Sequence, residues 1–278
     1  MVRNPGCQRA TKGIWVTNKS AKSSAPEDSP LERYFRALEA VAISTNGASV
    51  SEISESCNLP LGTAHRLLQN LLKAGLLANN GGRRKDYQLG ERMLRLLHAG
   101  TDTARLAISV QPILDQLANE FDDTCYLARL VGQEVVSVAW AAPSGGLRGH
   151  VVPGHILAPH VAASAKAILA FQSEALIDRV LSARLPKLTN ETKVDRAEIE
   201  RDYAAVRRKK YATCWNEMEI GFGAIAVPIP IPDAGVIYSV GTAGFIDRVK
   251  RRPVAQSVAM LQKAVEQLSR ALREPLIK

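Results

Sequence analysis

The side chains best placed to do chemistry in this chain are the polar ones of the stretch LPLGTAHRLLQNLLKAGLL, residues 59–77. Apolar residues recur there at steps of three and four, which is the spacing of one face of an α-helix. The opposite face carries hydrogen-bond donors and positive charge, and no acid: Thr63, His65, Arg66, Gln69, Asn70 and Lys73. Such groups bind phosphate oxygens and the edges of nucleic-acid bases. An ordinary solvated helix surface has a similar composition, so the surrounding elements must decide between the two interpretations.

Two helical segments are predicted around this stretch. Ser29-Pro30-Leu31-Glu32 is a capping box with proline at the first helical position, and apolar residues then repeat at helical spacing up to Asn46-Gly47. Ser49-Val50-Ser51-Glu52 is a second capping box, which opens a short helix that ends at Asn58-Leu59-Pro60. A tight turn then leads into the helix with the polar face. Two short helices joined in this way predict a helix-turn-helix.

A basic hairpin is predicted directly after the helix. Gly75 supplies a left-handed stop, and residues 76–90, LLANNGGRRKDYQLG, are typical of two short strands around a turn. Three cations follow the turn: Arg83, Arg84 and Lys85. A hairpin beside a helix-turn-helix is a wing, and its cations can neutralise phosphates in a flanking groove. This context favours DNA binding by the polar face, with Arg66 a candidate for contact with guanine or phosphate.

The length and the charge of the chain agree with a nucleic-acid partner. The chain has 278 residues, 46% of them hydrophobic, which predicts two domains with their own cores. Its formal charge of +9 favours an anionic partner. Residues 1–97 carry 14 Lys and Arg against 8 Asp and Glu, whereas residues 98–278 carry 22 against 19. The N-terminal third is therefore the more basic part, and residues 1–28 are predicted to be a disordered basic tail.

The cysteines and the apolar segments indicate a cytoplasmic protein. Cys7, Cys57, Cys125 and Cys214 lie far apart and form no Cys-x-x-Cys pair, which is typical of reduced thiols. No window approaches the roughly 18 consecutive apolar residues of a membrane span, and the N-terminus shows no secretory leader pattern. We therefore expect no membrane contact.

The remainder of the chain predicts a mixed α/β domain. Residues 91–121 have helical spacing with an interruption near Gly100. Strands are expected at 124–130, 134–140, 223–231 and 235–240, and helices at 160–171, 173–185, 195–210 and 253–272.

The loop at residues 143–159 and the helix after it hold the remaining candidate groups. Arg148 is a candidate to pair with a ligand carboxylate, and His160 and Ser164 are candidate pocket groups. A metal site is not predicted, because His150, His155 and His160 are spaced by five across prolines and a glycine. GFGAIA at 221–226 fits a dinucleotide fingerprint, but a strand follows it where a helix is needed. No Gly-x-Ser-x-Gly elbow exists, so we predict no cofactor and no catalytic residue.

The sequence resembles the IclR (isocitrate lyase regulator) family of bacterial transcription regulators over roughly residues 31–272. The resemblance is carried by SEISESCNLPLGTAHRLLQNLLKAGLL, YQLGERMLRL, PHVAASAKAILA and YATCWNEMEIGFGAIAVPI, before a last strand with serine. It implies an α+β protein with an N-terminal winged helix-turn-helix, a linker helix and a C-terminal PAS/GAF-like α/β effector-binding domain. The matching ranges are 29–90 for DNA binding, 91–105 for the linker, and 106–278 for effector binding and oligomerisation.

The resemblance also implies partners and functional residues. Family members are dimers or dimers of dimers that bind palindromic operators and respond to small organic acids or aromatic catabolites. The DNA-facing positions fall on Ser49, Ser51, Thr63, His65 and Arg66, with the wing at Arg83–Lys85. The effector pocket maps to the following residues: Leu157, Ala163, Ser164, Cys214, Phe222, Ala224, Ser239 and Gly241.

This sequence departs from the family pattern inside the implied pocket. Cys214-Trp215 stands where the family commonly has an acidic pair, and Gly223-Ala224 replaces the usual arginine-cysteine. Ala165 replaces the glycine before the helical lysine. The pocket has thus lost polar groups and gained Trp215 and Phe222, so we expect a more apolar or aromatic effector than a two- or three-carbon acid.

The expected function is a homo-oligomeric, effector-controlled DNA-binding regulator, repressor or activator, of a catabolic operon. Two alternatives stay open from the sequence. A small-molecule enzyme with an accessory helix-turn-helix would turn over a compound bound in the second domain. A winged-helix protein used for protein contacts would assemble without salt-dependent DNA binding.

Overall fold

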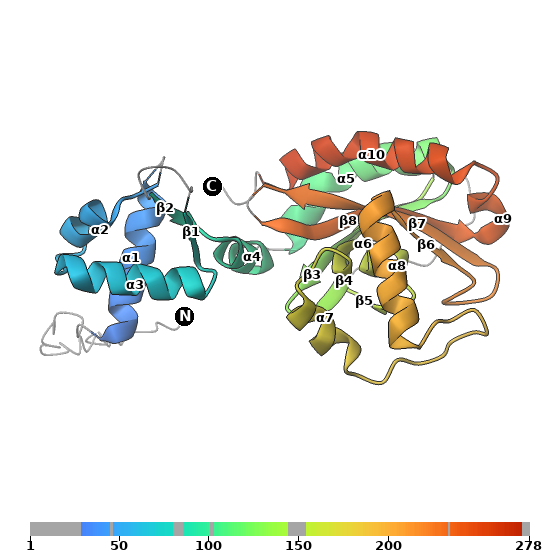
Figure 1. Ribbon diagram of the computed structural model, residues 1–278. Coiled ribbons are helices and arrows are strands. Elements are labelled where there is room, and N and C mark those ends of the chain that lie inside the picture. The colour runs from blue at the N-terminus through green and yellow to red at the C-terminus, as the bar shows by residue number, and fades with distance from the viewer. Residues whose placement is uncertain are drawn as a thin grey trace, which may run out of the picture.

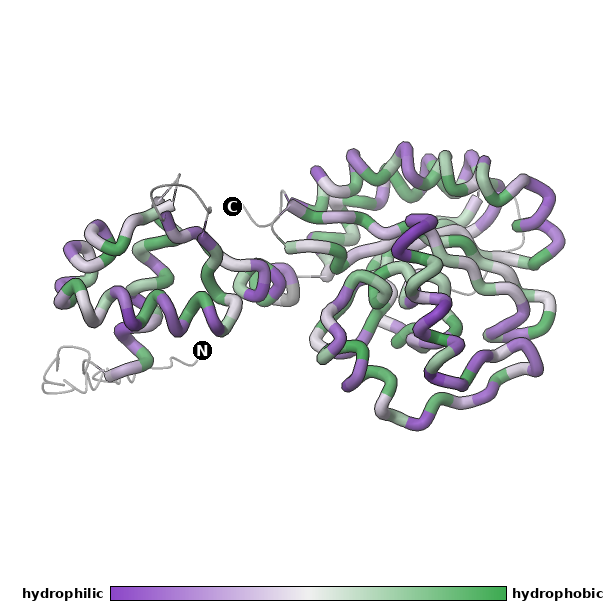
Figure 2. Tube along the Cα trace, in the orientation of Figure 1, coloured by the Kyte–Doolittle hydropathy of each residue, from purple (hydrophilic) through white to green (hydrophobic). Residues whose placement is uncertain are grey.

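The computed structural model describes residues 29–44, 47–79, 86–100, 103–143, 154–232 and 234–273. They form a smaller and a larger unit, and helix α4, Glu91–Gly100, lies between the two (Figure 1). The buried hydrophobic residues fall into two separate clusters, one in each unit. In the larger unit, hydrophobic positions concentrate on the strands, whereas the helices alternate between hydrophobic and hydrophilic positions (Figure 2). The expectation of two cores is therefore met.

The smaller unit has the predicted order of elements. It consists of α1 Pro30–Ile43, α2 Val50–Ser56, α3 Leu61–Lys73, and the hairpin strands β1 Leu77–Asn79 and β2 Tyr87–Leu89. Ser49 caps α2 in a full capping box, with its hydroxyl and its backbone N–H both hydrogen-bonded to Glu52. At α1 the Ser29 hydroxyl accepts from the Glu32 N–H at 3.2 Å. Gly75 has a φ of +71° and ends α3 as predicted.

The larger unit begins with α5, Thr103–Phe121, which contains Pro112. Its six-stranded sheet has the order β5-β4-β3-β8-β7-β6, and all neighbouring strands are antiparallel. The strands are β3 Thr124–Val131, β4 Glu134–Ala141, β5 Ile156–Leu157, β6 Ala212–Trp215, β7 Phe222–Ile231 and β8 Gly235–Phe245. The helices are α6 Ala163–Leu169, α7 Glu174–Leu181, α8 Arg196–Lys209, α9 Ile246–Val249 and α10 Val254–Ala271.

The sheet lies between two helical layers. Helices α5 and α10 contact each other and cover one face, whereas α6 packs on the other face with α8 beside it (Figure 1). Helix α6 approaches the sheet closely because the residues beneath it are small. A Cβ at Gly241 would lie 2.8 Å from the Ile225 carbonyl oxygen and 3.3 Å from the Ser164 hydroxyl. Gly241 is therefore required by the packing of α6 and its sheet.

Several elements differ from the sequence-based expectation. The helix expected at 160–171 is shorter, because residues 158–162 are non-helical before α6 begins. Strands β5 and β6 and helix α9 were not predicted, since two to four residues give too few periods for a pattern. Pro228 and Pro230 are tolerated in β7 because β6 pairs only with residues 223–226 of that strand. Among the described residues, no helix is long and apolar enough to cross a membrane.

Candidate nucleic-acid interface and ligand cavity

The polar face of α3 points away from the core of the smaller unit. The opposite stripe is buried: Ala64, Leu67, Leu68 and Leu71. This burial fixes the rotation of the helix, so that His65 and Arg66 are exposed and Thr63 and Gln69 are half-buried. The Asn70 amide donates to the Tyr34 hydroxyl at 2.7 Å, which ties α3 to α1. The face therefore presents hydrogen-bond donors and two exposed cations, Arg66 and Lys73, on a helix that carries no acid.

The predicted serines of α2 have different surroundings. The Ser49 hydroxyl is engaged by Glu52 at 2.7 Å and thus has a capping role in the isolated chain. Ser51 is exposed in the first turn of α2. The wing cations Arg83, Arg84 and Lys85 lie outside the described residues. Of the hairpin strands that flank them, β1 contacts α3 and β2 contacts α1.

One cavity of about 350 Å³ opens beside the start of α6, and we call it the ligand cavity. Five predicted effector residues line it: Leu157, Ala163, Cys214, Phe222 and Ala224. Sequence analysis missed the rest of the lining: Tyr126, His155, Ile156, Ala158, Ala162, Leu188, Met218 and Ala243. The side chains of Tyr126 and Cys214 are buried, whereas those of His155 and Leu188 are exposed and mark the mouth.

The described lining of the ligand cavity is apolar and close to neutral. It holds no Lys, Arg, Asp or Glu. Burial raises the pKa of Cys214 to about 11 and the pKa of Tyr126 to about 12, so both groups stay protonated at neutral pH. A ligand would thus meet hydrophobic walls, one phenol and one thiol.

The other predicted effector residues do not line this cavity. His160 is buried with Nε2 2.9 Å from the Pro186 carbonyl oxygen. The Ser239 hydroxyl donates to the Ser164 carbonyl at 3.1 Å, so these serines, like Gly241, hold α6 on the sheet. Trp215 follows Cys214 on β6, and successive side chains of a strand point to opposite faces. Its ring accordingly packs against Gly223 and lies under the Lys250 ammonium. Arg148 lies outside the described residues.

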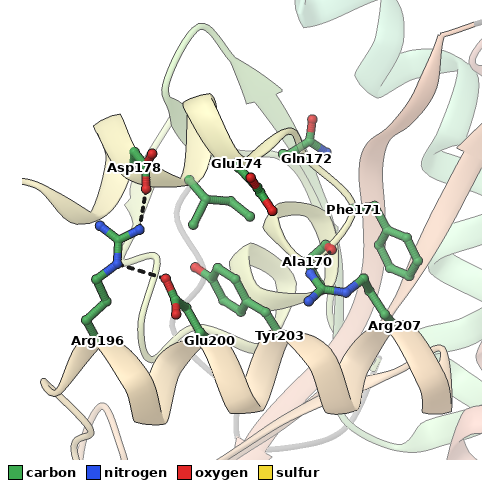
Figure 3. Close-up of a pocket in the computed structure, with 10 residues that line it drawn as sticks. Ala170, Phe171, Gln172, Glu174, Asp178, Arg196, Glu200, Tyr203 and Arg207 are labelled. Carbon is green, nitrogen blue, oxygen red and sulfur yellow. Dashed lines mark hydrogen bonds and ion pairs between the residues drawn. The ribbon is translucent and has the colours of Figure 1, made fainter.

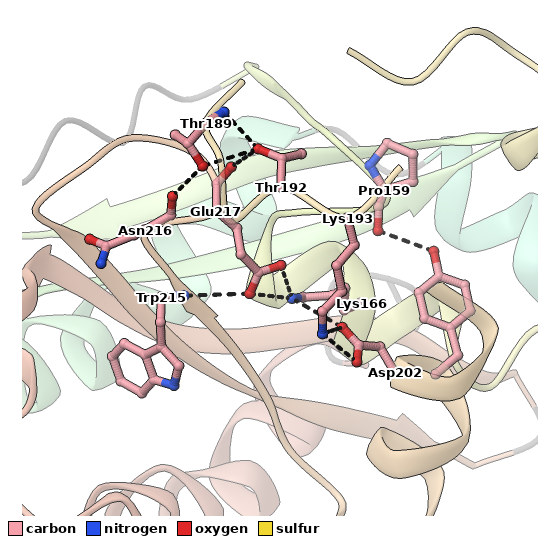
Figure 4. Close-up of polar contacts among 10 residues, drawn as sticks. Pro159, Lys166, Thr189, Thr192, Lys193, Asp202, Trp215, Asn216 and Glu217 are labelled. Atoms are coloured by element: carbon pink, nitrogen blue, oxygen red, sulfur yellow. Dashed lines mark hydrogen bonds and ion pairs between the residues drawn. The ribbon is translucent and has the colours of Figure 1, made fainter. Parts of the chain in front are cut away.

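A buried ion pair connects three segments that form the cavity wall (Figure 4). The Lys166 ammonium of α6 lies 2.7 Å from one Glu217 carboxylate oxygen and 2.9 Å from the other. The Thr192 hydroxyl donates to the Glu217 carbonyl at 2.6 Å, and the Thr189 hydroxyl donates to the Asn216 carbonyl at 2.6 Å. These contacts join α6, the β6–β7 turn and the segment that carries Leu188. Sequence analysis missed this network because its members are 25 to 51 positions apart.

A second cavity, of about 800 Å³, lies between α7 and α8 (Figure 3). It shares no residue with the predicted effector set, and three of its five charged side chains, those of Asp178, Arg196 and Glu200, pair with one another. Arg196 binds Glu200 at 2.8 Å and also pairs with Asp178, while Arg207 donates to the Ala170 carbonyl. Internal pairing leaves little affinity for a ligand, so we take the smaller ligand cavity as the candidate site. In the described part of the chain, no three His, Cys, Asp or Glu side chains could hold a metal ion.

Comparison with known proteins finds a family model that matches each of the two units. The model of the IclR helix-turn-helix domain matches residues 30–81, and that of the bacterial transcriptional regulator IclR C-terminal domain matches residues 98–270. The chain is 30% identical over 205 residues to the "Probable transcriptional regulator SauR" of Cupriavidus necator, covering 72% of this chain and 78% of that protein. It is 25% identical over 228 residues to the Pca regulon regulatory protein of Pseudomonas putida, covering 81% and 77%.

A solved structure extends this similarity. The crystal structure of an IclR homolog complexed with 4-hydroxybenzoate, from Microbacterium hydrocarbonoxydans, superposes with a TM-score of 0.56 at 25% identity. The match covers 88% of this chain and 99% of that one.

A helix-turn-helix unit with an acid-free outer face, joined to a separate α/β unit, defines a DNA-binding transcription regulator. The chain belongs to the IclR family of bacterial transcriptional regulators, which confirms the resemblance drawn from its sequence. The family consists of regulators, so the alternative of an enzyme with an accessory helix-turn-helix is not supported.

Proposed function

We propose that this regulator binds a palindromic operator as a homodimer or homotetramer in the bacterial cytoplasm, and that a small molecule in the ligand cavity changes that binding. The observation that carries the DNA assignment is the acid-free polar face of α3, which the buried stripe holds outward. Direct contacts are assigned to Thr63, His65, Arg66 and Gln69, with Ser49, Ser51 and the wing cations on the phosphates. The linker function is assigned to 91–105, and effector binding and oligomerisation to 106–278.

The effector is assigned to the class of aromatic or otherwise apolar catabolites. The size of the cavity, about 350 Å³, suits a single substituted ring, and its described lining offers a phenol, a thiol and hydrophobic walls. The related structure with 4-hydroxybenzoate supports an aromatic acid in particular. A carboxylate on the ring requires a partner at the mouth, where His155 lies and for which Arg148 remains the candidate. Control of a catabolic operon follows from such an effector.

A thermal-shift series tests the effector assignment. 4-Hydroxybenzoate, benzoate, phenol, 4-hydroxybenzamide and pyruvate are each added to the full chain. A ligand at 100 times its dissociation constant adds about 2.7 kcal/mol to native stability, so a ring compound that binds raises the melting temperature clearly. We expect at least one ring compound to do so and pyruvate not to.

Ala163→Trp is the matched control for this series. The new side chain fills the cavity beside Cys214, so it should abolish the ligand-induced shift while operator binding without ligand persists. A stronger response to pyruvate than to every ring compound would contradict the proposed effector class. An undiminished shift in Ala163→Trp would place the effector site elsewhere.

A further inference from the structure

Helix α4 contacts the larger unit through Leu94, His98 and Arg95, and Arg95 makes the contact nearest to α6. The Arg95 guanidinium donates to the Gln172 side-chain carbonyl at 2.9 Å and to the Ala234 backbone carbonyl at 3.3 Å. Glu91, one turn earlier on α4, pairs with the same guanidinium and thereby orients it. The side chain of Arg95 is only 28% exposed, so water competes weakly for these bonds.

Gln172 is buried at the end of α6 and joins several elements. Its amide group donates to the Ile168 carbonyl of α6 at 2.9 Å and to the Val236 carbonyl of β8 at 2.6 Å. Its carbonyl oxygen accepts from Arg95. One side chain thus binds α6, β8 and α4 together. Because each bond fixes the amide plane, a movement of α6 must change the geometry of the bond to Arg95.

The other end of α6 borders the ligand cavity. Ala163, its first residue, lines the cavity, and all seven residues of the helix are buried. Seven helical residues span about 10 Å. Close packing lets so short a buried helix shift only as a body, so a ligand against Ala163 acts on Gln172 at the far end.

Helix α4 is joined to α3 by a separate contact. The Arg92 guanidinium donates to the carbonyl of Ala74, the C-terminal cap of α3, at 3.0 Å. The start of α4 is also packed tightly, because a Cβ at Gly90 would lie 2.5 Å from the Gly75 carbonyl oxygen. Arg92 therefore holds α3, and Arg95 holds the larger unit, from neighbouring positions of one helix.

We propose that the Arg95–Gln172 contact is the positioning joint through which the ligand cavity controls α4 and, with it, the orientation of α3. The proposal rests on the proposed function only in taking that cavity as the effector site. Occupancy of the cavity moves α6, the Arg95–Gln172 contact changes or breaks, and α4 carries the DNA-binding unit to a different position. Gln172 and Arg95 thus act as positioning residues and touch neither DNA nor effector.

Amide hydrogen exchange of residues 91–100 in the full chain, without DNA or ligand, tests the joint. Gln172→Leu keeps the volume and removes the amide, and Arg95→Met removes the guanidinium from a partly exposed site that cannot disrupt the core. Each should accelerate exchange in α4 about fivefold, the factor that corresponds to one ordinary hydrogen bond. The control is Arg105→Ala, an exposed arginine on α5, which should leave α4 unchanged. Unchanged exchange in β3 and β4 verifies that each variant is folded.

A second substitution imitates the ligand. Ala163→Leu enlarges a side chain inside the cavity and should alter α4 exchange in the otherwise wild-type chain, but not in the Gln172→Leu background. Equal α4 exchange in Gln172→Leu and Arg105→Ala would overturn the proposal, as would an Ala163→Leu effect of the same size in both backgrounds. Because no effector enters the measurement, a failed thermal-shift series would contradict the effector assignment and leave this outcome unaffected.

Discussion

Arg66 is the residue on which the proposed DNA contact depends most. Its side chain is exposed on α3 and contributes nothing to the core, so Arg66→Ala should leave folding and oligomeric state intact. Loss of a base contact should weaken operator binding by about 1–3 kcal/mol, and loss of a phosphate contact should lower the salt slope by about one unit. Fluorescence anisotropy at matched salt measures both, and Arg201→Ala, an exposed arginine of the larger unit, is the control. Equal affinity of Arg66→Ala and wild type would remove Arg66 from the interface.

The residues of the ligand cavity show how far single positions could be predicted. The family resemblance predicted Cys214, Phe222 and Ala224 as pocket residues, and all three line the ligand cavity. Trp215 does not, since alternation along β6 turns it to the opposite face, a consequence that required the strand to be recognised. Tyr126 was missed because it pairs with Gly241, 115 positions later in the chain, and spacing along the chain reports no such contact.

The Lys166–Glu217 pair belongs to the scale of elements, because it joins α6 to the β6–β7 turn. Lys166 is 3% exposed and Glu217 is 10% exposed, so Glu217→Gln would leave a buried ammonium without its main counter-ion. We expect a loss of about 3–5 kcal/mol, towards the lower value because an Asp202 carboxylate oxygen lies 4.0 Å from the same ammonium. Urea unfolding followed by tryptophan fluorescence measures this loss of unfolding free energy, since Trp140 and Trp215 lie in the larger unit.

The exposed pair of Glu266 and Arg270 provides the comparison. Its atoms are 3.5 Å apart at i,i+4 on α10, so Glu266→Gln should change the unfolding free energy by no more than about 0.5 kcal/mol. A loss of that small size for Glu217→Gln would show that the buried network does not hold the cavity wall.

His98 should make the docking of α4 dependent on pH. Its Nδ1 lies 3.3 Å from the Tyr238 hydroxyl of β8, and burial, with Arg129 nearby, lowers its pKa from 6.5 to about 4. A histidine with a lowered pKa in the folded state contributes stability above pH 6.5, and that contribution is lost as the pH falls towards 4. His98→Gln should therefore show less destabilisation than wild type on acidification through this window, as measured by urea unfolding.

Asp123 should change the pH dependence of folding stability in the opposite direction to His98. Burial raises its pKa from 3.8 to about 6 against the effect of Arg248, so its contribution is present below pH 3.8 and lost as the pH rises through 6. Asp123→Asn should accordingly steepen the loss of stability on acidification. Parallel pH profiles for wild type and His98→Gln would show that His98 titrates normally in the folded chain.

At the scale of elements, patterns with local causes were predicted well. The caps at Ser29 and Ser49, the buried stripe of α3 and the stop at Gly75 were all read from neighbouring residues, and the structure confirms them. The strand order of the larger sheet was beyond such reasoning, because β3 pairs with β8 across more than 100 residues. The Arg95–Gln172 contact could not be predicted for the same reason, because the two residues are 77 positions apart.

At the scale of the whole molecule, the two units match two family models, and residues 82–97, with most of α4, lie between the two matches. The exact division at residues 90 and 105 stays a prediction, as does the role of the tail at 1–28. The basic excess of the N-terminal third agrees with an electrostatic share in DNA binding, and it comes from residues 1–28 and 83–85, which lie outside the described residues. The larger unit is nearly balanced in charge and carries the neutral ligand cavity instead.

The most direct test of this account is the salt dependence of binding to DNA that the full chain itself selects from a random duplex pool. We predict enrichment of an inverted repeat, tight binding to it relative to a scrambled duplex, and a linear fall of log affinity with log salt between about 50 and 200 mM. Arg66→Ala should bind the same duplex more weakly. A selected pool without a repeat, or equal affinity for selected and scrambled duplexes, would contradict the claim that α3 reads an operator.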